Sequence, residues 1–433
     1  MQHSLNIFFN TTKVGILFYD SQSNEFDLKY DENWIENGFA ISNILGFDYN
    51  FKSIDIKNFV ENLLPEGDGL DRIVNYLQIS KNNKFALLNA IGEETSGALS
   101  FIKEDAIDIT KTSFREISHE ELTKRIQQRK EIPITIWDKK PRLSIAGVQE
   151  KLPICKLEGK YGLAQGQLCS THILKFDKAD ENLVLNEYFS LQLAKTAGLN
   201  IPKVEIKKFG DEFVLEVERF DRKIVSNTHI EKIHIIDSCQ ALGLPTSFKY
   251  ERNFGNGRDV KNIREGVSFK KLDTLSKKVK VPILAKKTLL EWTIVNLILG
   301  NSDAHGKNIS YFLDKSGLSI TPFYDIVNIS LYEDKYDTSL AMAIDDEFNL
   351  SDLTPYDIVS HCHNLHLTPK VFYENFNQIS KKIEKKLLNI TDEISKYNPN
   401  FAKEYTKNIS TRIDKLTTVL KESLKIALEE IKY

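Results

Sequence analysis

The sequence has few cysteines and no long apolar run. Its four cysteines, Cys155, Cys169, Cys239 and Cys362, are scattered and form no CxxC pair, which fits a reducing cytosol better than a disulfide framework. No segment reaches the roughly 20 apolar residues that a membrane-spanning helix needs. The first residues lack the basic and apolar regions of a signal peptide. We therefore expect a cytoplasmic protein.

The sequence also has no excess of basic over acidic side chains. The formal net charge is -3, which argues against broad binding of nucleic acid through a basic surface but leaves phosphorylated small ligands possible. A length of 433 residues allows two or three domains. A hydrophobic content of 41% and a charged content of 27% are those of an ordinary globular protein.

The most informative stretch is 289–328, in which an apolar helix runs into a polar loop. Apolar residues cover all faces of the helix, so it should be buried, and Gly300 can end it. Five polar residues follow within eight positions: Asn301, Asp303, His305, Lys307 and Asn308. Buried polar groups need hydrogen-bond partners, which water or a metal-bound phosphate could supply.

The spacing of these residues favours a phosphate. Asp303 precedes Asn308 by five positions, the separation between the catalytic aspartate and the metal-binding asparagine of protein kinases. The segment 309–323 reads as a hairpin that would bring Asp325 back beside Asn308. Asn308 and Asp325 would then supply hard oxygen ligands to Mg²⁺. Asp and Asn are also common in turns, so this spacing alone is weak evidence.

A second group of motifs lies upstream and suggests a nucleotide site. Strands are expected at 143–146 and 152–157, joined by a glycine-containing turn that could cover phosphates, although one glycine in a hairpin is usually only a turn. Lys175 follows in a predicted strand, 171–176, as the ATP-binding lysine does in kinases, and Glu187 in the next helix is a candidate partner. The next strands should end at a hinge, where Glu218 to Phe220 would offer backbone groups to adenine.

The remaining regions lack a catalytic constellation. The pattern of residues 4–30 predicts an antiparallel meander, and three helices and a strand follow it. Residues 102–140 resemble a connection to the next domain. From Thr354 onward the pattern is helical. His361, Cys362, His363 and His366 superficially suggest zinc, but packing at a helix end is the better interpretation.

Several motifs in order resemble the HipA family of bacterial toxin kinases. They are SIAGVQEKLPI, THILKF, NEYFSLQLAKTAGLNIP, ERFDR, IHIIDSCQALGLP, GNSDAHGKN and FYDIVN, which span residues 144–328. The N-terminal region, with LPEGDG and SGALSF, resembles the N-terminal subdomain of full-length members. The resemblance therefore covers nearly the whole chain.

This resemblance implies an α+β fold of the two-lobed, protein-kinase-like type, related to phosphoinositide kinases. It would have a small α/β N-terminal subdomain and an all-helical C-lobe. We expect the subdomain at 1–105, a linker at 106–140, the kinase N-lobe at 141–222 and the helical C-lobe at 223–433.

The resemblance also implies a serine/threonine-protein kinase toxin that uses ATP and Mg²⁺. Such a toxin would phosphorylate a host protein, as characterised members do with aminoacyl-tRNA synthetases, and so arrest growth. Its usual partner would be a helix-turn-helix, HipB-like antitoxin, with DNA contacted mainly through that partner. Autophosphorylation of Ser144 at the head of the loop would switch the enzyme off, because a dianionic group there repels ATP phosphates.

The assigned roles can be stated together. Asp303 is the expected catalytic base, with His305 shaping the loop and Lys307 neutralising transferred charge. Mg²⁺ is assigned to Asn308 and Asp325. The expected nucleotide-binding residues are Ser144, Ala146, Gly147, Val148, Gln149, Lys175, Glu218 and Phe220. The polar segment 247–266 is a candidate contact for a protein substrate.

Two alternatives remain at this stage. A small-molecule kinase of the aminoglycoside or lipid type shares the spacing of the acid and the asparagine. A catalytically silent nucleotide-binding co-repressor would act through its antitoxin-type partner, although the complete set of Asp303, Asn308, Asp325 and Lys175 speaks against it.

Overall fold

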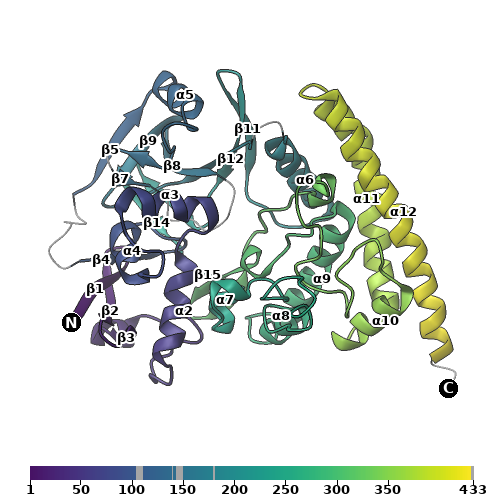
Figure 1. Ribbon diagram of the computed structural model, residues 1–433, viewed down its shortest axis with the longest axis horizontal. Coiled ribbons are helices and arrows are strands. Elements are labelled where there is room, and N and C mark those ends of the chain that lie inside the picture. Colours follow the sequence, from purple (N-terminus) through teal and green to yellow (C-terminus); the bar gives the residue numbers. More distant parts are fainter. Residues whose placement is uncertain (104–110, 139, 143–149, 179–180, 431–433) are drawn as a thin grey trace. The chain divides into compact units, whose positions relative to one another are not determined.

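The computed structural model describes residues 1–103, 111–138, 140–142, 150–178 and 181–430 (Figure 1). The chain divides into two compact units. The first unit comprises Met1–Val184, Pro202–Thr246 and Tyr311–Thr321. The second comprises Leu185–Ile201, Ser247–Ser310 and Pro322–Tyr433. The domain boundaries expected from the sequence differ from this division and stay predictions.

The first unit begins with the predicted antiparallel meander, which is confirmed. Strands β1 (Gln2–Phe9), β2 (Thr12–Asp20), β3 (Glu25–Tyr30) and β4 (Leu99–Ile102) form a sheet in the order β3-β2-β1-β4. Between β3 and β4 lie α1 (Glu32–Asn37), α2 (Ser53–Leu63), α3 (Gly67–Leu77) and α4 (Lys84–Ile91). Alternate strand residues such as Leu5, Ile7 and Leu17 are buried, as the period of two requires.

A six-stranded antiparallel sheet follows in the same unit. It has the order β11-β12-β10-β8-β9-β5. Its strands are β5 (Ser113–Ile117), β8 (Lys151–Leu157), β9 (Lys160–Gln165), β10 (His172–Phe176), β11 (Val204–Phe209) and β12 (Glu212–Glu218). The predicted strand around Lys175 is thus confirmed as β10.

The segment expected to be a linker differs from that expectation. It supplies β5 to the edge of the six-stranded sheet, then α5 (His119–Gln127) and the pair β6 (Ile136–Trp137) and β7 (Lys140–Pro141). Leu122, Ile126 and Trp137 are buried in one core with Leu174 and Phe176 of β10. Burial of these apolar side chains makes the segment part of the sheet's core.

Residues 222–237 also differ from the all-helical C-lobe that was expected. Strands β13 (Arg222–Ser226) and β14 (His229–Lys232) pair as a hairpin. Strand β15 (Ile235–Asp237) pairs with β16 (Ser310–Asp314), which pairs with β17 (Gly317–Ile320), and α7 (Ser238–Leu242) follows β15. β-Branched residues explain the strands at 224–225. The hairpin predicted after the polar loop is confirmed as β16 and β17.

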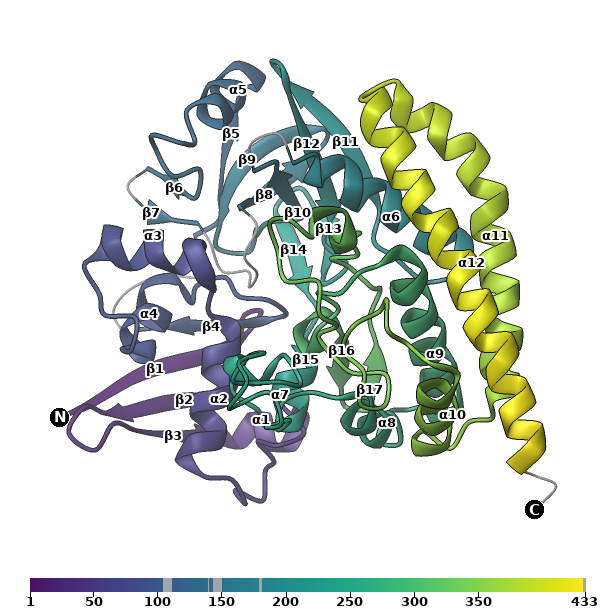
Figure 2. The ribbon, with the colours of Figure 1, turned by 45° about the vertical axis from the view of Figure 1, so that its right-hand side comes forward.

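The second unit is predominantly helical. Its helices are α6 (Leu183–Ala197), α8 (Phe269–Ser276), α9 (Pro282–Leu299), α10 (Pro355–Asn364), α11 (Pro369–Ser395) and α12 (Pro399–Glu430). Short 3₁₀ helices are η1 (Thr246–Phe248), η2 (Gly306–Asn308) and η3 (Ile329–Tyr332). Figure 2 shows α11 and α12 side by side. Each helix buries apolar side chains along one stripe, as the sequence pattern predicts.

An ion cluster in the first unit ties the N-terminal subdomain to the end of β12. Asp221 accepts hydrogen bonds from Arg219 Nη2 at 2.7 Å, from Arg222 Nη1 at 2.9 Å and from the Gly97 backbone N–H at 2.9 Å. All three side chains are buried. Burial alone would raise the pKa of the Asp221 carboxyl. The two guanidinium groups instead hold this pKa well below its ordinary range.

We predict that Asp221→Asn lowers the free energy of unfolding by about 3 kcal/mol, because two buried guanidinium groups lose their shared counter-charge. Asp211→Asn, at an exposed position, is the matched control. Urea denaturation at neutral pH measures both. Asp221 has a lowered pKa in the folded state, so its contribution is present above the unfolded-state pKa of about 4 and is lost as the pH falls further. Equal stability of both variants would contradict the role given to this cluster.

Candidate active site

The site is built from the end of α9. Gly300 ends this helix in the left-handed conformation, with φ of +66°, and its N–H bonds the Asn296 carbonyl. A Cβ at this position would lie 2.2 Å from Arg412 Nη1 and 2.6 Å from Ser330 Oγ. Both the backbone conformation and the lack of space therefore require glycine here.

The loop after Gly300 is buried except for one side chain. Asn301, Ser302, His305, Lys307 and Asn308 are between 3% and 7% exposed. Asp303 alone among residues 301–308 is exposed. A loop that hides its other polar side chains while presenting one carboxylate is suited to use that carboxylate on a substrate.

The backbone around Asp303 is held by the loop's own residues. The Asp303 carbonyl accepts from the His305 backbone N–H at 2.8 Å and from Asn308 Nδ2 at 2.9 Å. The Asn308 backbone N–H in turn donates to the His305 carbonyl at 2.9 Å. The five-residue spacing noted in the sequence thus closes a ring in which Asn308 contacts Asp303.

Two further residues of this loop have structural contacts. The His305 ring meets the Tyr250 ring edge to face, with centroids 5.1 Å apart. The Lys307 carbonyl accepts from the Tyr324 hydroxyl at 2.7 Å. The same hydroxyl lies 2.6 Å from Ser310 Oγ. The roles predicted for His305 and Lys307 both stay predictions.

Asp325 lies near the same helix end. It has a φ of +51°, which is unusual for a residue with a side chain. Its carbonyl accepts from Asn301 Nδ2 at 3.4 Å, and Asn301 Nδ2 also bonds Asn296 Oδ1 at 2.8 Å. Asn301 therefore links the segment that carries Asp325 to the end of α9.

Buried amides hold the segment that follows Asp325. The Asn328 backbone N–H donates to Asn186 Oδ1 at 2.8 Å, and Asn186 Nδ2 donates back to the Asn328 carbonyl at 3.0 Å. Asn328 Nδ2 also donates to Asn408 Oδ1 of α12 at 3.0 Å. These bonds to α6 and α12 explain the asparagine that ends the FYDIVN motif.

The donor atoms of this region fit a hard cation. The amide nitrogen of Asn308 donates to the Asp303 carbonyl, and this bond does not involve the amide oxygen of Asn308. Asn301 Oδ1 is buried and has no hydrogen-bond partner within the described part of the chain. Amide and carboxylate oxygens are the ligands that Mg²⁺ prefers, and Asn308 and Asp325 supply one of each.

The candidate nucleotide residues lie in the first unit. Lys175 of β10 is 5% exposed, and the register places it opposite Lys151 of β8, which is also 5% exposed. Leu174 and Phe176, on the other face of β10, are buried in the apolar core. The two lysines are therefore neighbours on one face of the sheet.

The hinge residues follow at the end of β12. The Glu218 side chain is exposed and its backbone N–H donates to the Lys203 carbonyl at 2.9 Å. The Phe220 ring meets Phe312 of β16 at 5.9 Å, edge to face. Ser144, Ala146, Gly147, Val148 and Gln149 lie outside the described residues, so the phosphate role assigned to them stays a prediction.

Glu187 and Lys175 belong to different units. Glu187 is on α6 and is 1% exposed. Its role as partner of Lys175 stays a prediction.

Sequence reasoning missed two residues, Lys151 and Tyr250. Lys151 could have been found from the alternation in KLPICKL, once β8 is paired with β10. Tyr250 donates its hydroxyl to Asp303 Oδ1 at 2.6 Å, a contact between positions 53 apart that no local pattern indicates.

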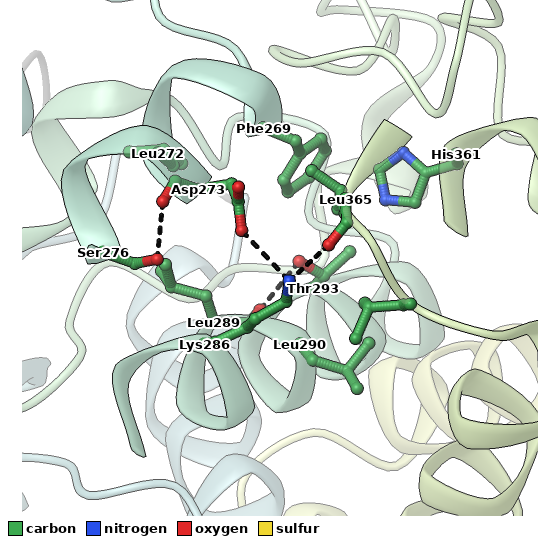
Figure 3. A pocket seen from close by; sticks show the side chains of 11 residues that line it. Phe269, Leu272, Asp273, Ser276, Lys286, Leu289, Leu290, Thr293, His361 and Leu365 are labelled. Carbon is green, nitrogen blue, oxygen red and sulfur yellow. Dashed lines mark hydrogen bonds and ion pairs between the residues drawn. The ribbon is translucent and has the colours of Figure 1, made fainter. Parts of the chain in front are cut away.

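In the cluster at 361–366, His361 packs against aromatic rings, whereas His363 and His366 are exposed. The His361 ring meets Phe269 at 5.1 Å and Phe372 at 6.4 Å, both edge to face, and burial lowers its pKa to about 4. His361 lines a cavity of about 30 Å³ beside the ion pair of Lys286 with Asp273 (Figure 3). In the described ranges, no three His, Cys, Asp or Glu side chains group as metal ligands would.

Comparison with known proteins gives matches over most of the chain. A family model described as the HipA-like C-terminal domain matches residues 143–396, and one described as the HipA N-terminal domain matches residues 5–102. The chain is 44% identical over 371 residues to the serine/threonine-protein kinase toxin HipA of Shewanella oneidensis, covering 86% of this chain and 85% of that protein. It is 30% identical to the putative kinase Y4mE of Sinorhizobium fredii, over 81% of this chain and 82% of that protein.

A solved structure gives the same result. It is that of Shewanella oneidensis HipA with HipB and its operator DNA. The match has a TM-score of 0.88 and 40% identity, and it covers 97% of this chain and 99% of that one. Within the described residues, no helix is both long and apolar enough to cross a membrane. The chain therefore belongs to the HipA family, and it is a serine/threonine-protein kinase toxin of a toxin-antitoxin system.

Proposed function

We propose that Asp303 is the catalytic base that accepts the proton of a serine or threonine hydroxyl as the γ-phosphate of ATP is transferred. The observation that carries this proposal is the exposure of Asp303 in a loop whose other side chains are buried. The ring closed by His305 and Asn308 fixes the Asp303 backbone, so the carboxylate is carried by a rigid segment of the chain.

Asn308 and Asp325 would hold Mg²⁺, which supplies charge neutralisation on the transferred phosphate when bound. The closed loop orients the Asn308 amide, and Asn301 with the amides around Asn328 orients the Asp325 backbone. Lys307 would neutralise transferred charge and His305 would keep the loop in shape.

Lys175 and Lys151 would bind the ATP phosphates as a pair. Their cross-strand register supports this role, because two ammonium groups on one face of a sheet can contact the same phosphate chain. The loop from Ser144 to Gln149 would cover the phosphates, and the backbone of Glu218 to Phe220 would contact the adenine edge.

The proposed target is a host protein, with an aminoacyl-tRNA synthetase as the expected class, so that phosphorylation inhibits translation in the cytoplasm. The expected partner is a HipB-like antitoxin through which DNA is contacted. The solved relative with HipB and operator DNA supports this part of the proposal. Autophosphorylation of Ser144 would inhibit the kinase.

We predict that Asp303→Asn lowers phosphate transfer at least about 100-fold, because general base catalysis typically contributes that much. Transfer from radiolabelled ATP to a panel of purified aminoacyl-tRNA synthetases and to candidate small alcohols measures the loss and separates protein from small-molecule kinases. Asp334→Asn, at an exposed position, is the control. Growth arrest by the Asp303→Asn variant in cells would contradict the assignment.

Lys151→Met and Lys175→Met should each reduce kcat/KM for ATP, on the order of tenfold or more, because each removes one of two positive charges from the phosphate site. Steady-state kinetics at varied ATP measures this effect. Lys160→Met on β9 removes a lysine that is 61% exposed and should leave the kinetics unchanged. Normal ATP kinetics in Lys151→Met would show that only Lys175 binds phosphate.

Ser144→Ala should keep kinase activity and prevent its decline during incubation with ATP, because the inhibitory phosphate can no longer form. Mass spectrometry of the wild-type protein after incubation should find phosphate on Ser144. A wild-type protein that loses activity without phosphate on Ser144 would argue against this switch.

A further inference from the structure

Tyr250 contacts the carboxylate of Asp303, and the proposed chemistry gives this tyrosine no role. Tyr250 comes from the polar segment 247–266, which the sequence suggested only as a substrate contact. Its hydroxyl donates to Asp303 Oδ1 at 2.6 Å, and both residues belong to the second unit. Tyr250 is 36% exposed, so its hydroxyl meets Asp303 at the surface where a substrate would arrive.

The backbone on both sides of Tyr250 is anchored to the catalytic loop and to a neighbouring segment. On one side, the Lys249 carbonyl accepts from the Gly306 backbone N–H at 2.9 Å. On the other, the Glu251 backbone N–H donates to the Ala341 carbonyl at 2.9 Å. The Ala341 backbone N–H donates in turn to the Ser302 carbonyl at 2.8 Å. Tyr250 is therefore held between two connections to the loop that carries Asp303.

The Glu251 side chain strengthens this anchor. Its buried carboxylate accepts from the Ala343 backbone N–H at 2.9 Å and forms an ion pair with Arg264 at 2.6 Å. Gly266 packs so closely that a Cβ would lie 1.8 Å from the Tyr250 carbonyl oxygen. A buried ion pair and a backbone contact that excludes any side chain both restrict where the tyrosine can lie.

The Tyr250 ring is also supported. It meets the His305 ring at an angle of 88°, and Lys249 Nζ lies 5.3 Å from its centroid. The edge-to-face contact and the cation over the ring are both favourable for an aromatic side chain. The hydroxyl thus reaches Asp303 from a fixed ring.

We infer that Tyr250 is a positioning residue for Asp303, an inference that rests on the proposed function. A carboxylate at an exposed position can rotate about its last torsion, and a fixed donor on Oδ1 selects one orientation. Oδ2 is then left to accept the proton of the incoming hydroxyl.

The test compares Tyr250→Phe with wild type in transfer of phosphate from radiolabelled ATP into the protein of a bacterial lysate. Phenylalanine keeps the ring against His305 and removes only the hydroxyl. We expect kcat to fall about tenfold, with KM for ATP and the Tm unchanged, because only the orientation of the base is lost. Tyr356→Phe, which removes a hydroxyl from a side chain 69% exposed on α10, should behave as wild type.

One further variant makes the result decisive. Tyr250→Leu removes ring and hydroxyl together, and it should lose little more than Tyr250→Phe does. A loss confined to the leucine variant would overturn the inference, since it would show that packing of the ring is what matters. A faster Tyr250→Phe enzyme would also overturn it, because the hydroxyl would then be a plug that substrate must displace.

Asp303→Asn, assayed in parallel, separates this inference from the proposed function. An active Asp303→Asn enzyme would refute Asp303 as the base, and the role of Tyr250 with it. An inactive Asp303→Asn enzyme beside a fully active Tyr250→Phe enzyme would refute the tyrosine alone.

Discussion

Polar groups removed from water must find partners inside the protein, and this constraint governs the loop after α9. The loop buries Asn301, His305, Lys307 and Asn308, so their hydrogen bonds decide its path. Asn308 bonds back to Asp303, and Asn301 reaches the segment of Asp325. These two bonds pair the buried side-chain amide groups of Asn308 and Asn301, and they also hold the backbone of the candidate base and of the segment that carries Asp325.

The ERFDR motif at the end of β12 shows the same constraint acting on charges. Arg219, Asp221 and Arg222 point into a buried ion cluster that also binds the backbone of Gly97. Glu218 is exposed and Phe220 is half-buried. Arg219 and Asp221 therefore fix the backbone between them, which is the part of the motif proposed to contact adenine. Charged residues in a motif need not touch a ligand to be required for binding it.

The parts predicted from the sequence are those set by local spacing. The hairpin of β16 and β17 spans few residues, so turn and strand signals were enough to predict it. The spacing of Asp303 and Asn308 is visible in the sequence, but the hydrogen bond between them is seen only in the structure. The pairing of β5 with β9 joins distant segments, and the sequence pattern of 102–140 indicates only a connection between domains. Tyr250 and Lys151 were missed for the same reason, since each gains its role from a contact that only the folded chain creates.

The tie between α12 and the helix end at Gly300 bears on how such a toxin is made. Asn408 and Arg412 of α12 bond Asn328 and Ser330, close in the chain to Asp325, and α12 is translated after both of them. A chain still growing on the ribosome lacks these partners for its buried amides. The order of synthesis therefore delays the full anchoring of the segment that carries Asp325 until α12 has been made.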